Sequence, residues 1–162
     1  MMKIDNTDRF ILKLIQEDGR IAASHIAEEL EISIPTVTER IKKMQDAGII
    51  SGIHAVLDPK KLELDVSAVI TVISESSLHY KEFTDQAEKA PEVVQCFSTT
   101  GKGSHTLLVV TKNTKTLEEL LRTIQSWPGV ARTETQIILS SYKLHQKILI
   151  IQNFLTKKNS KF

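Results

Sequence analysis

The chain has 162 residues, of which 41% are hydrophobic and 25% charged, and its formal net charge is +1. This composition is typical of a folded globular protein and argues against disorder. The single cysteine, Cys96, excludes an intrachain disulfide, and the five histidines form no metal-binding pattern, so we expect no metal, no cofactor and no catalytic residues. Because no apolar run is as long as a membrane span, we expect a cytoplasmic protein that does not associate with membranes.

The charge is distributed unevenly along the chain. Residues 1–61 hold nine basic and ten acidic residues, residues 62–142 hold seven basic and ten acidic, and residues 143–162 hold five basic and no acidic residues. The small net charge therefore conceals a basic C-terminal extension. We expect two domains, over residues 1–61 and 62–142, followed by that extension.

Apolar residues at helical spacing predict three helices within the first domain. Asp5 and Ser33 are suited to accept hydrogen bonds from the free N–H groups that begin the first and third helices, and Gly48 is suited to end the third. The β-branched stretch that follows is typical of a short strand, or wing. We expect the helices at Asn6–Gln16, Ala22–Leu30 and Ile34–Asp46, the strand at Ile49–Leu57 and a turn at Asp58–Lys61.

The second domain contains an internal repeat, in which Pro91 corresponds to Pro128 and Val93 to Val130. Each copy consists of a strand, a helix, a proline turn and a second strand. Two such units predict a ferredoxin-like α+β domain, with both helices on one face of a single sheet. The strands are expected at Val66–Ser74, Val93–Thr100, Ser104–Thr111 and Val130–Leu139, and the helices at His79–Lys89 and Thr116–Ser126.

The other face of this predicted sheet has no cover within one chain. In so small a domain it would form a large exposed apolar patch, to which we expect Val69, Val109 and Ile137 to contribute. We therefore expect two chains to form a homodimer through their sheets.

The closely spaced second and third helices predict a helix-turn-helix, in which the N-terminus of the later helix enters the major groove of DNA. Hydroxyl groups near that N-terminus can reach base edges or phosphates, and two cations one turn apart can pair with phosphate. The alternative is a three-helix core whose third helix is simply solvated. The candidate DNA-binding residues on this geometry are Ser33, Thr36, Thr38, Arg40 and Lys43.

Several short segments of the first domain follow one another in a specific order. They are Asp5-x-x-Asp8-x-x-Ile11-Leu12, Gly19-Arg20-Ile21, Ile26-Ala27, Ile32-Ser33, Pro35-Thr36-Val37-x-x-Arg40-Ile41 and Gly48-Ile49-Ile50-x-Gly52. Together they resemble the winged helix-turn-helix of the Lrp/AsnC regulators, also called feast/famine regulators. The duplicated second domain is similar to the domain with which these regulators assemble and bind amino-acid effectors.

The resemblance implies a sequence-specific transcriptional regulator of promoter DNA that responds to an amino acid or another small metabolite. It also implies homodimers that assemble further into octamers or other even-numbered oligomers on double-stranded DNA. By position, the residues that match the DNA-reading part of this family are Ser33, Pro35, Thr36, Thr38 and Arg40.

Two places depart from the pattern of this family. Many members have glycine between the two helices, where the backbone φ is positive; Glu31 stands there in this chain, so we expect a slightly strained turn. The loop between the two repeat units usually supplies a carboxylate near the amino group of the effector, whereas residues 100–106 contain none. A zwitterionic amino acid needs an anionic partner for its ammonium group.

Three interpretations of this loop stay open. It is a plain glycine-rich connection, it holds an effector through backbone N–H groups, or it binds a different and more anionic ligand. The candidate effector-binding residues are Gly101, Gly103, Ser104 and His105.

Two other functions compete with transcription regulation. Sirohaem decarboxylases resemble this family and are enzymes, but they need histidines and arginines around a tetrapyrrole. Here the second domain offers only His79, His105, Arg122 and Arg132, which are scattered along the sequence. The third possibility is a ligand-sensing or assembly module with a vestigial helix-turn-helix. The intact residues of the third helix favour a DNA-binding regulator that is not an enzyme.

Overall fold

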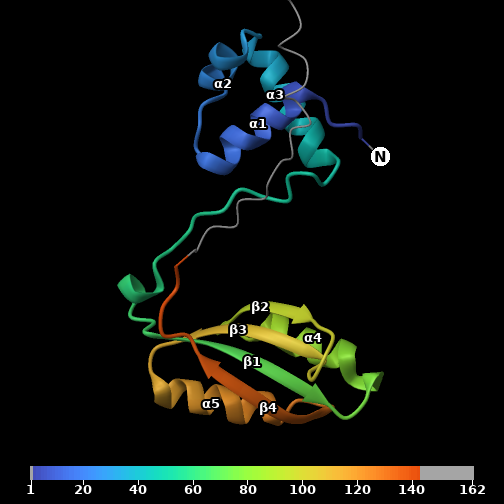
Figure 1. Cartoon of the computed structure of the whole chain (residues 1–162), viewed down its shortest axis with the longest axis vertical. Helices are drawn as coiled ribbons and strands as arrows, with labels where there is room; N and C mark the ends of the chain where they lie inside the picture. Colours follow the sequence, from blue (N-terminus) through green and yellow to red (C-terminus); the bar gives the residue numbers. More distant parts are fainter. Residues whose placement is uncertain (1, 143–162) are drawn as a thin grey trace, which may run out of the picture. The chain divides into compact units, whose positions relative to one another are not determined.

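The computed structural model of the chain describes residues 2–142 and divides them into two compact units (Figure 1). The first unit ends at Val56 and the second begins at Leu57, close to the predicted domain boundary. The basic C-terminal extension, residues 143–162, lies outside the described residues.

The first unit consists of three helices, α1 (Asn6–Glu17), α2 (Ala23–Leu30) and α3 (Ile34–Asp46). All three lie where the apolar periodicity predicts them. One side of each helix enters a common core, in which the side chains of Ile11, Ile26, Val37 and Met44 are completely buried. This core holds α3 in place while its opposite side stays in contact with solvent.

Side chains begin α1 and α3 as the sequence predicts. The carboxylate of Asp5 accepts the backbone N–H of Asp8 at 2.8 Å, and the carboxylate of Asp8 accepts the backbone N–H of Asp5 at 3.1 Å. This reciprocal capping box satisfies two donors that the first turn leaves free. The hydroxyl of Ser33 accepts the N–H of Thr36 at 3.3 Å and caps α3.

The strand predicted at Ile49–Leu57 is wrong, because no residue of this segment is in a strand. The N–H of Ile49 instead bonds the carbonyl oxygen of Met44 at 2.8 Å, so the chain still follows the end of α3. β-branched residues favour a strand only where a neighbouring strand completes the ladder, and the described part of this unit has none. The turn predicted at Asp58–Lys61 is present as a short 3-10 helix, Pro59–Leu62.

The second unit is a four-stranded antiparallel sheet with the strand order β2-β3-β1-β4 (Figure 1). Two helices, α4 and α5, contribute Phe83, Ala87, Leu117, Leu120 and Ile124 to one core against the sheet. This arrangement confirms the predicted ferredoxin-like domain. The bounds are β1 (Val66–Ser74), α4 (Tyr80–Lys89), β2 (Val93–Ser98), β3 (His105–Thr111), α5 (Thr114–Gln125) and β4 (Val130–Ile137), with a single 3-10 turn at Ser77–His79 before α4.

The strand register corrects the predicted composition of the uncovered sheet face. Val109 is completely buried among the helices and pairs with Ala68, which faces the same core. Ile137 also pairs with Ala68, so it lies on the helix-covered face, although it is 50% exposed at the end of β4. Because successive side chains of a strand point to opposite faces of the sheet, Val69 and its partner Leu108 lie on the uncovered face. Val69 is therefore the one correct residue of the three predicted there.

Candidate nucleic-acid interface and effector site

The turn between α2 and α3 has the geometry of a tight helix-turn-helix. Glu31 adopts the left-handed conformation, with φ at 53° and ψ at 39°, in agreement with the strain predicted for a non-glycine residue there. The N–H of Ile32 bonds the carbonyl oxygen of Ala27 at 3.0 Å and closes the end of α2. The chain then turns directly into Ser33, so the N-terminus of α3 follows α2 with no intervening loop.

The hydroxyl groups predicted to read DNA lie at the surface around this N-terminus. Ser33, Pro35 and Thr38 are exposed, and Thr36 is partly exposed. The hydroxyl oxygens of Ser33 and Thr36 lie 2.8 Å apart, and the hydroxyl of Thr38 donates to the carbonyl oxygen of Ile34 at 3.0 Å. Each oxygen keeps acceptor capacity, whereas Pro35 has no backbone N–H and the N–H of Thr36 is bonded to Ser33.

Arg40 has a different environment from the other predicted DNA-binding residues. Its Nη1 atom lies 2.7 Å from a carboxylate oxygen of Asp5 and 2.8 Å from one of Asp8. The side chain of Asp8 is only 3% exposed, whereas that of Arg40 is 31% exposed. The guanidinium group therefore joins α3 to the capping box of α1, which the spacing of these residues along the sequence does not reveal.

The electrostatics of this cluster favour its charged state. The backbone N–H of Asp8 and the Arg40 guanidinium lower the pKa of Asp5, although partial burial opposes them. Hydrogen bonds from Arg40 to Asp5 and Asp8 in turn raise the pKa of Arg40. The charged forms of Asp5 and Arg40 are thus both favoured.

Lys43 lies one turn beyond Arg40 and is solvent-exposed. Its Nζ atom is 2.7 Å from a carboxylate oxygen of Glu39, with both side chains more than 60% exposed. The hydrogen bond from Lys43 lowers the pKa of Glu39. An ion pair this exposed is weak and opens readily, so Lys43 stays available to a phosphate group.

The predicted effector residues are arranged mainly to hold their own loop against β1. The N–H of Ser104 donates to the carbonyl oxygen of Val72 at 2.9 Å, and the hydroxyl of Ser104 lies 2.6 Å from that of Ser74. A Cβ atom at Gly103 would overlap the side chain of Thr71 and lie 2.9 Å from the Val72 carbonyl oxygen. Gly101, with φ at 106° and open space around it, forms the exposed tip.

His105 is buried and only 2% exposed. Its ring centroid lies 4.8 Å from that of Tyr80 and 4.6 Å from that of Phe83, and its Nδ1 atom is 3.0 Å from the hydroxyl oxygen of Ser104. Burial lowers the pKa of His105 because it disfavours the charged imidazolium. A neutral, enclosed imidazole packs in the core and has little surface left for a ligand.

Residues 2–142 contain neither a candidate metal cluster nor a helix suited to span a membrane. No group of three or more histidine, cysteine, aspartate or glutamate side chains there is arranged to hold a metal ion. Within the same range, no helix has the length and apolar character that crossing a membrane requires.

Comparison with family models divides the chain as the structure does. A winged helix-turn-helix DNA-binding model matches residues 4–51, and the Lrp/AsnC ligand binding domain matches residues 67–148. The HTH-type transcriptional regulator FL11 of Pyrococcus horikoshii is 33% identical over 140 residues, which cover 86% of this chain and 92% of that protein. The regulatory protein AsnC of Escherichia coli is 33% identical over 139 residues, covering 85% of this chain and 91% of AsnC.

Solved structures agree with these relatives. The structure of Escherichia coli AsnC superposes with a TM-score of 0.83 and 31% identity, covering 90% of this chain and 99% of that one. A transcriptional regulator of Neisseria meningitidis, crystallised with L-Met, gives a TM-score of 0.84 and 28% identity, covering 90% of this chain and 96% of its own. These relatives are named as regulators, which confirms the prediction that the chain is not an enzyme. The chain belongs to the Lrp/AsnC family of DNA-binding transcriptional regulators.

Proposed function

We propose that this regulator reads double-stranded DNA through the N-terminal half of α3. The single observation that carries the proposal is the exposed row of hydroxyl groups at the start of α3, directly after the tight turn at Glu31. Hydroxyl groups beside the positive end of the helix dipole suit both phosphate oxygens and base edges. Because transcription regulation takes place where promoter DNA lies, the proposal includes a cytoplasmic location.

The proposed contacts fall into two classes. The first class lies in the N-terminal half of the helix, which would enter the major groove and reach base edges. It comprises Ser33, Pro35, Thr36 and Thr38. Lys43 lies two turns further along the same helix and suits a phosphate group on the groove wall. We therefore assign sequence preference to the N-terminal residues and salt-dependent affinity to Lys43.

For Arg40 we propose an indirect role in place of the direct contact that the sequence predicts. Its guanidinium already binds two carboxylates, one of them almost fully buried, so a phosphate or a guanine would have to compete with Asp5 and Asp8. The ion pairs fix the middle of α3 against the start of α1. Arg40 is then a positioning residue that sets the angle at which the helix N-terminus meets DNA.

Two variants separate these roles of Arg40. In the positioning model, Asp8→Asn weakens DNA binding in the same way as Arg40→Ala, and neither changes the salt dependence of binding. If Arg40 contacts phosphate directly, Arg40→Ala lowers the slope of log K against log salt by about 1, while Asp8→Asn frees the guanidinium and strengthens binding. The second pattern would contradict the positioning role.

Lrp/AsnC regulators bind DNA and assemble into oligomers. We propose that this chain dimerises through the uncovered sheet face, where Val69, Leu108, Val110 and Phe97 surround threonines. A two-fold axis would then place two α3 helices on palindromic half-sites, and further pairing would give an octamer or another even-numbered assembly. Phe97→Asp is expected to convert the dimer into a monomer in light-scattering measurements.

We also propose that a small molecule of the amino-acid class tunes this regulator. The chain has the ligand-binding domain of the family, and a relative from Neisseria meningitidis crystallised with L-Met. The loop residues Gly101, Gly103, Ser104 and His105 stay candidates for the effector site through their backbone groups. The packing of Ser104 and His105 favours the interpretation of this loop as a structural connection.

Selection of bound fragments from sheared genomic DNA tests the proposed function. The expected result is a recurring half-site, with two copies spaced by whole turns of the double helix. Recovery of fragments without any shared sequence would overturn sequence-specific binding. Failure to retain any DNA at low salt would favour the vestigial helix-turn-helix.

A further inference from the structure

The N-terminal end of α3 exposes an apolar side chain to which no role has been assigned above. Ile34 is the first residue of α3 and is 50% exposed, whereas Val37 and Met44 further along the same helix are completely buried. Its neighbours along the chain, Ser33 and Pro35, are also exposed. Ile34 therefore lies at the surface, at the end of the helix that the proposed function directs into the major groove.

Two further apolar groups lie beside Ile34. Pro35 follows it directly, and Thr38 lies one turn later on the same side, because residues four positions apart are neighbours on a helix. The hydroxyl of Thr38 donates to the carbonyl oxygen of Ile34 at 3.0 Å, which fixes the Thr38 side chain and the position of its methyl group. A single exposed apolar residue is common on a protein surface, whereas these three groups form one surface. We call Ile34, Pro35 and the methyl group of Thr38 the apolar patch of α3.

The apolar patch has few freely rotating bonds. Isoleucine is branched at Cβ and has one strongly preferred rotamer in a helix, and the ring of Pro35 fixes its own φ. The hydroxyl of Ser33 caps the first turn through the N–H of Thr36, which holds the backbone beneath the patch. A surface with so little side-chain freedom loses little conformational entropy when a ligand covers it.

The chemistry of the apolar patch matches one group of the major groove. All four bases present hydrogen-bonding groups there, but thymine alone among them adds an apolar group, the methyl at C5. The side chain of Ile34 has no donor or acceptor and cannot read the polar edges. The neighbouring hydroxyls of Ser33 and Thr36 suit those edges, so the start of α3 offers one polar and one apolar side.

We propose that the apolar patch, with Ile34 at its centre, packs on the C5 methyl group of thymine and makes thymine a required base of each half-site. Ile34 is then a specificity-determining residue, in addition to the polar residues assigned above. This inference rests on the proposed function, because it needs α3 in the major groove. It adds the identity of a base that this helix selects.

Deoxyuridine in place of thymidine gives a direct test, because it removes the methyl group and leaves the other groups of the base pair in place. Each thymine position of the selected duplex is substituted in both half-sites, and binding to the full-length protein is followed by fluorescence anisotropy. Burial of one methyl group corresponds to about a fourfold change in affinity. At one thymine position or more, substitution in both half-sites is therefore expected to weaken binding about fifteenfold.

Ile34→Ala assigns this loss to the apolar patch. Alanine favours the helix at an exposed position, so the variant is expected to fold. It should bind the thymine duplex more weakly and should lose most of its discrimination against uracil at the sensitive position. Ile53→Ala is the matched control and should keep the full discrimination, because Ile53 is 49% exposed in the same unit but lies beside Gly19.

Two substitutions at Thr38 separate its methyl group from its hydroxyl. Thr38→Ser keeps the hydroxyl and loses the methyl group, whereas Thr38→Val keeps a methyl group and loses the hydroxyl. If the apolar patch reads thymine, Thr38→Ser reduces the discrimination against uracil and Thr38→Val retains it. The reverse result would overturn the patch, since it would assign thymine recognition to the hydroxyl.

The possible failures are distinguishable. A protein that prefers the selected duplex over a scrambled one, yet binds the thymine and uracil duplexes equally, would overturn the apolar contact and leave the DNA-binding function in place. Discrimination against uracil that persists in Ile34→Ala would overturn the role of Ile34. Failure to bind any duplex would overturn both this inference and the proposed function.

Discussion

The N-terminus of α3 and the loop Gly101–His105 are both rich in small polar residues, but the fold uses them in opposite ways. At α3, the hydroxyl-bearing side chains lie at the surface, because the apolar side of the helix is anchored elsewhere by Val37 and Met44. In the loop, Ser104 and His105 are bonded and packed against β1 and α4. Residue type alone does not separate a binding surface from a structural connection. The contacts of each side chain do.

The substitution Arg40→Ala has the largest expected effect on the free energy of unfolding. Arg40→Ala leaves the almost fully buried carboxylate of Asp8 without its cation, which costs free energy of unfolding. We expect a loss of about 2–3 kcal/mol, below the range for fully buried pairs because Arg40 keeps partial contact with solvent. Hydrogen exchange of the amides of α1 and α3 in the full-length protein measures it. Lys43→Ala is the control, because its exposed pair with Glu39 leaves exchange unchanged.

Gly103→Ala tests whether the loop before β3 is a structural connection packed against β1. The added methyl group would overlap the side chain of Thr71 and approach the carbonyl oxygen of Val72, so the loop would have to move away from β1. We expect a loss of about 1–3 kcal/mol in the free energy of unfolding. Urea titration monitored by the fluorescence of Trp127 reports on this unit. Equal stability of Gly103→Ala and the control Lys102→Ala would show that the loop is loosely held against β1.

Glu31→Gly is expected to stabilise the helix-turn-helix. The left-handed conformation of Glu31 is unfavourable for a residue with a side chain, and glycine adopts it without strain. Glycine also has the greater conformational entropy in the unfolded chain, which offsets part of this benefit. We expect a net increase of about 0.5–1 kcal/mol in the free energy of unfolding. Glu29→Gly, inside α2, should instead lose about 1 kcal/mol. A loss in both variants by thermal denaturation would mean that the turn is not strained.

The smallest expected effect is a pH dependence centred on His105. Its pKa lies below the ordinary value of 6.5 in the folded state, so the unfolded chain binds the proton more readily. The contribution of a neutral His105 is therefore fully present above about pH 6.5 and is lost as the pH falls towards its folded pKa. Urea midpoints of the second unit should decrease over this interval. His105→Gln should remove that part of the decrease, and an unchanged slope would exclude His105 as its origin.

Much of the fold could be predicted from local sequence patterns. The periodicity of α1 to α3, the caps at Asp5 and Ser33 and the repeat in the second unit each depend on residues close together in the chain, and all are present in the structure. The strand predicted at Ile49–Leu57 is wrong because a strand requires a partner. The face assigned to Val109 is wrong because a shift of one residue moves a side chain to the other side of the sheet.

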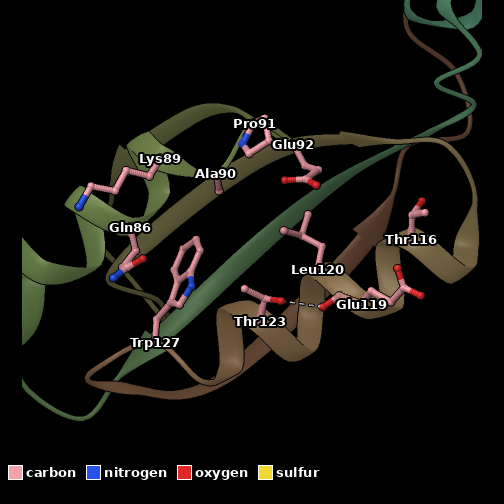
Figure 2. A pocket seen from close by; sticks show the side chains of 10 residues that line it. All are labelled: Gln86, Lys89, Ala90, Pro91, Glu92, Thr116, Glu119, Leu120, Thr123 and Trp127. Carbon is pink, nitrogen blue, oxygen red and sulfur yellow. Dashed lines mark hydrogen bonds between the residues drawn. The ribbon is translucent and has the colours of Figure 1, made fainter.

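For the site residues too, features that depend on neighbouring positions could be predicted, whereas contacts between distant positions could not. The exposed position of Thr38 follows from helical spacing, whereas the contact of Arg40 with Asp5 joins positions 35 residues apart. A hollow lined by Ala90, at the end of α4, and Leu120 of α5 brings together distant segments in the same way (Figure 2). The ring contact between Trp127 and Phe83 of α4, with centroids 5.4 Å apart, also appears only once the helices are packed together.

Binding of a DNA duplex, recovered by selection, over a series of salt concentrations tests the central claim most directly. We expect the unmodified chain to prefer this duplex about 1,000-fold or more over a scrambled one. We expect Lys43→Ala to weaken binding to both duplexes alike and to reduce the salt slope by about 1. Equal affinity of the unmodified chain for both duplexes, or a Lys43→Ala variant with unchanged slope, would contradict the account that α3 reads DNA.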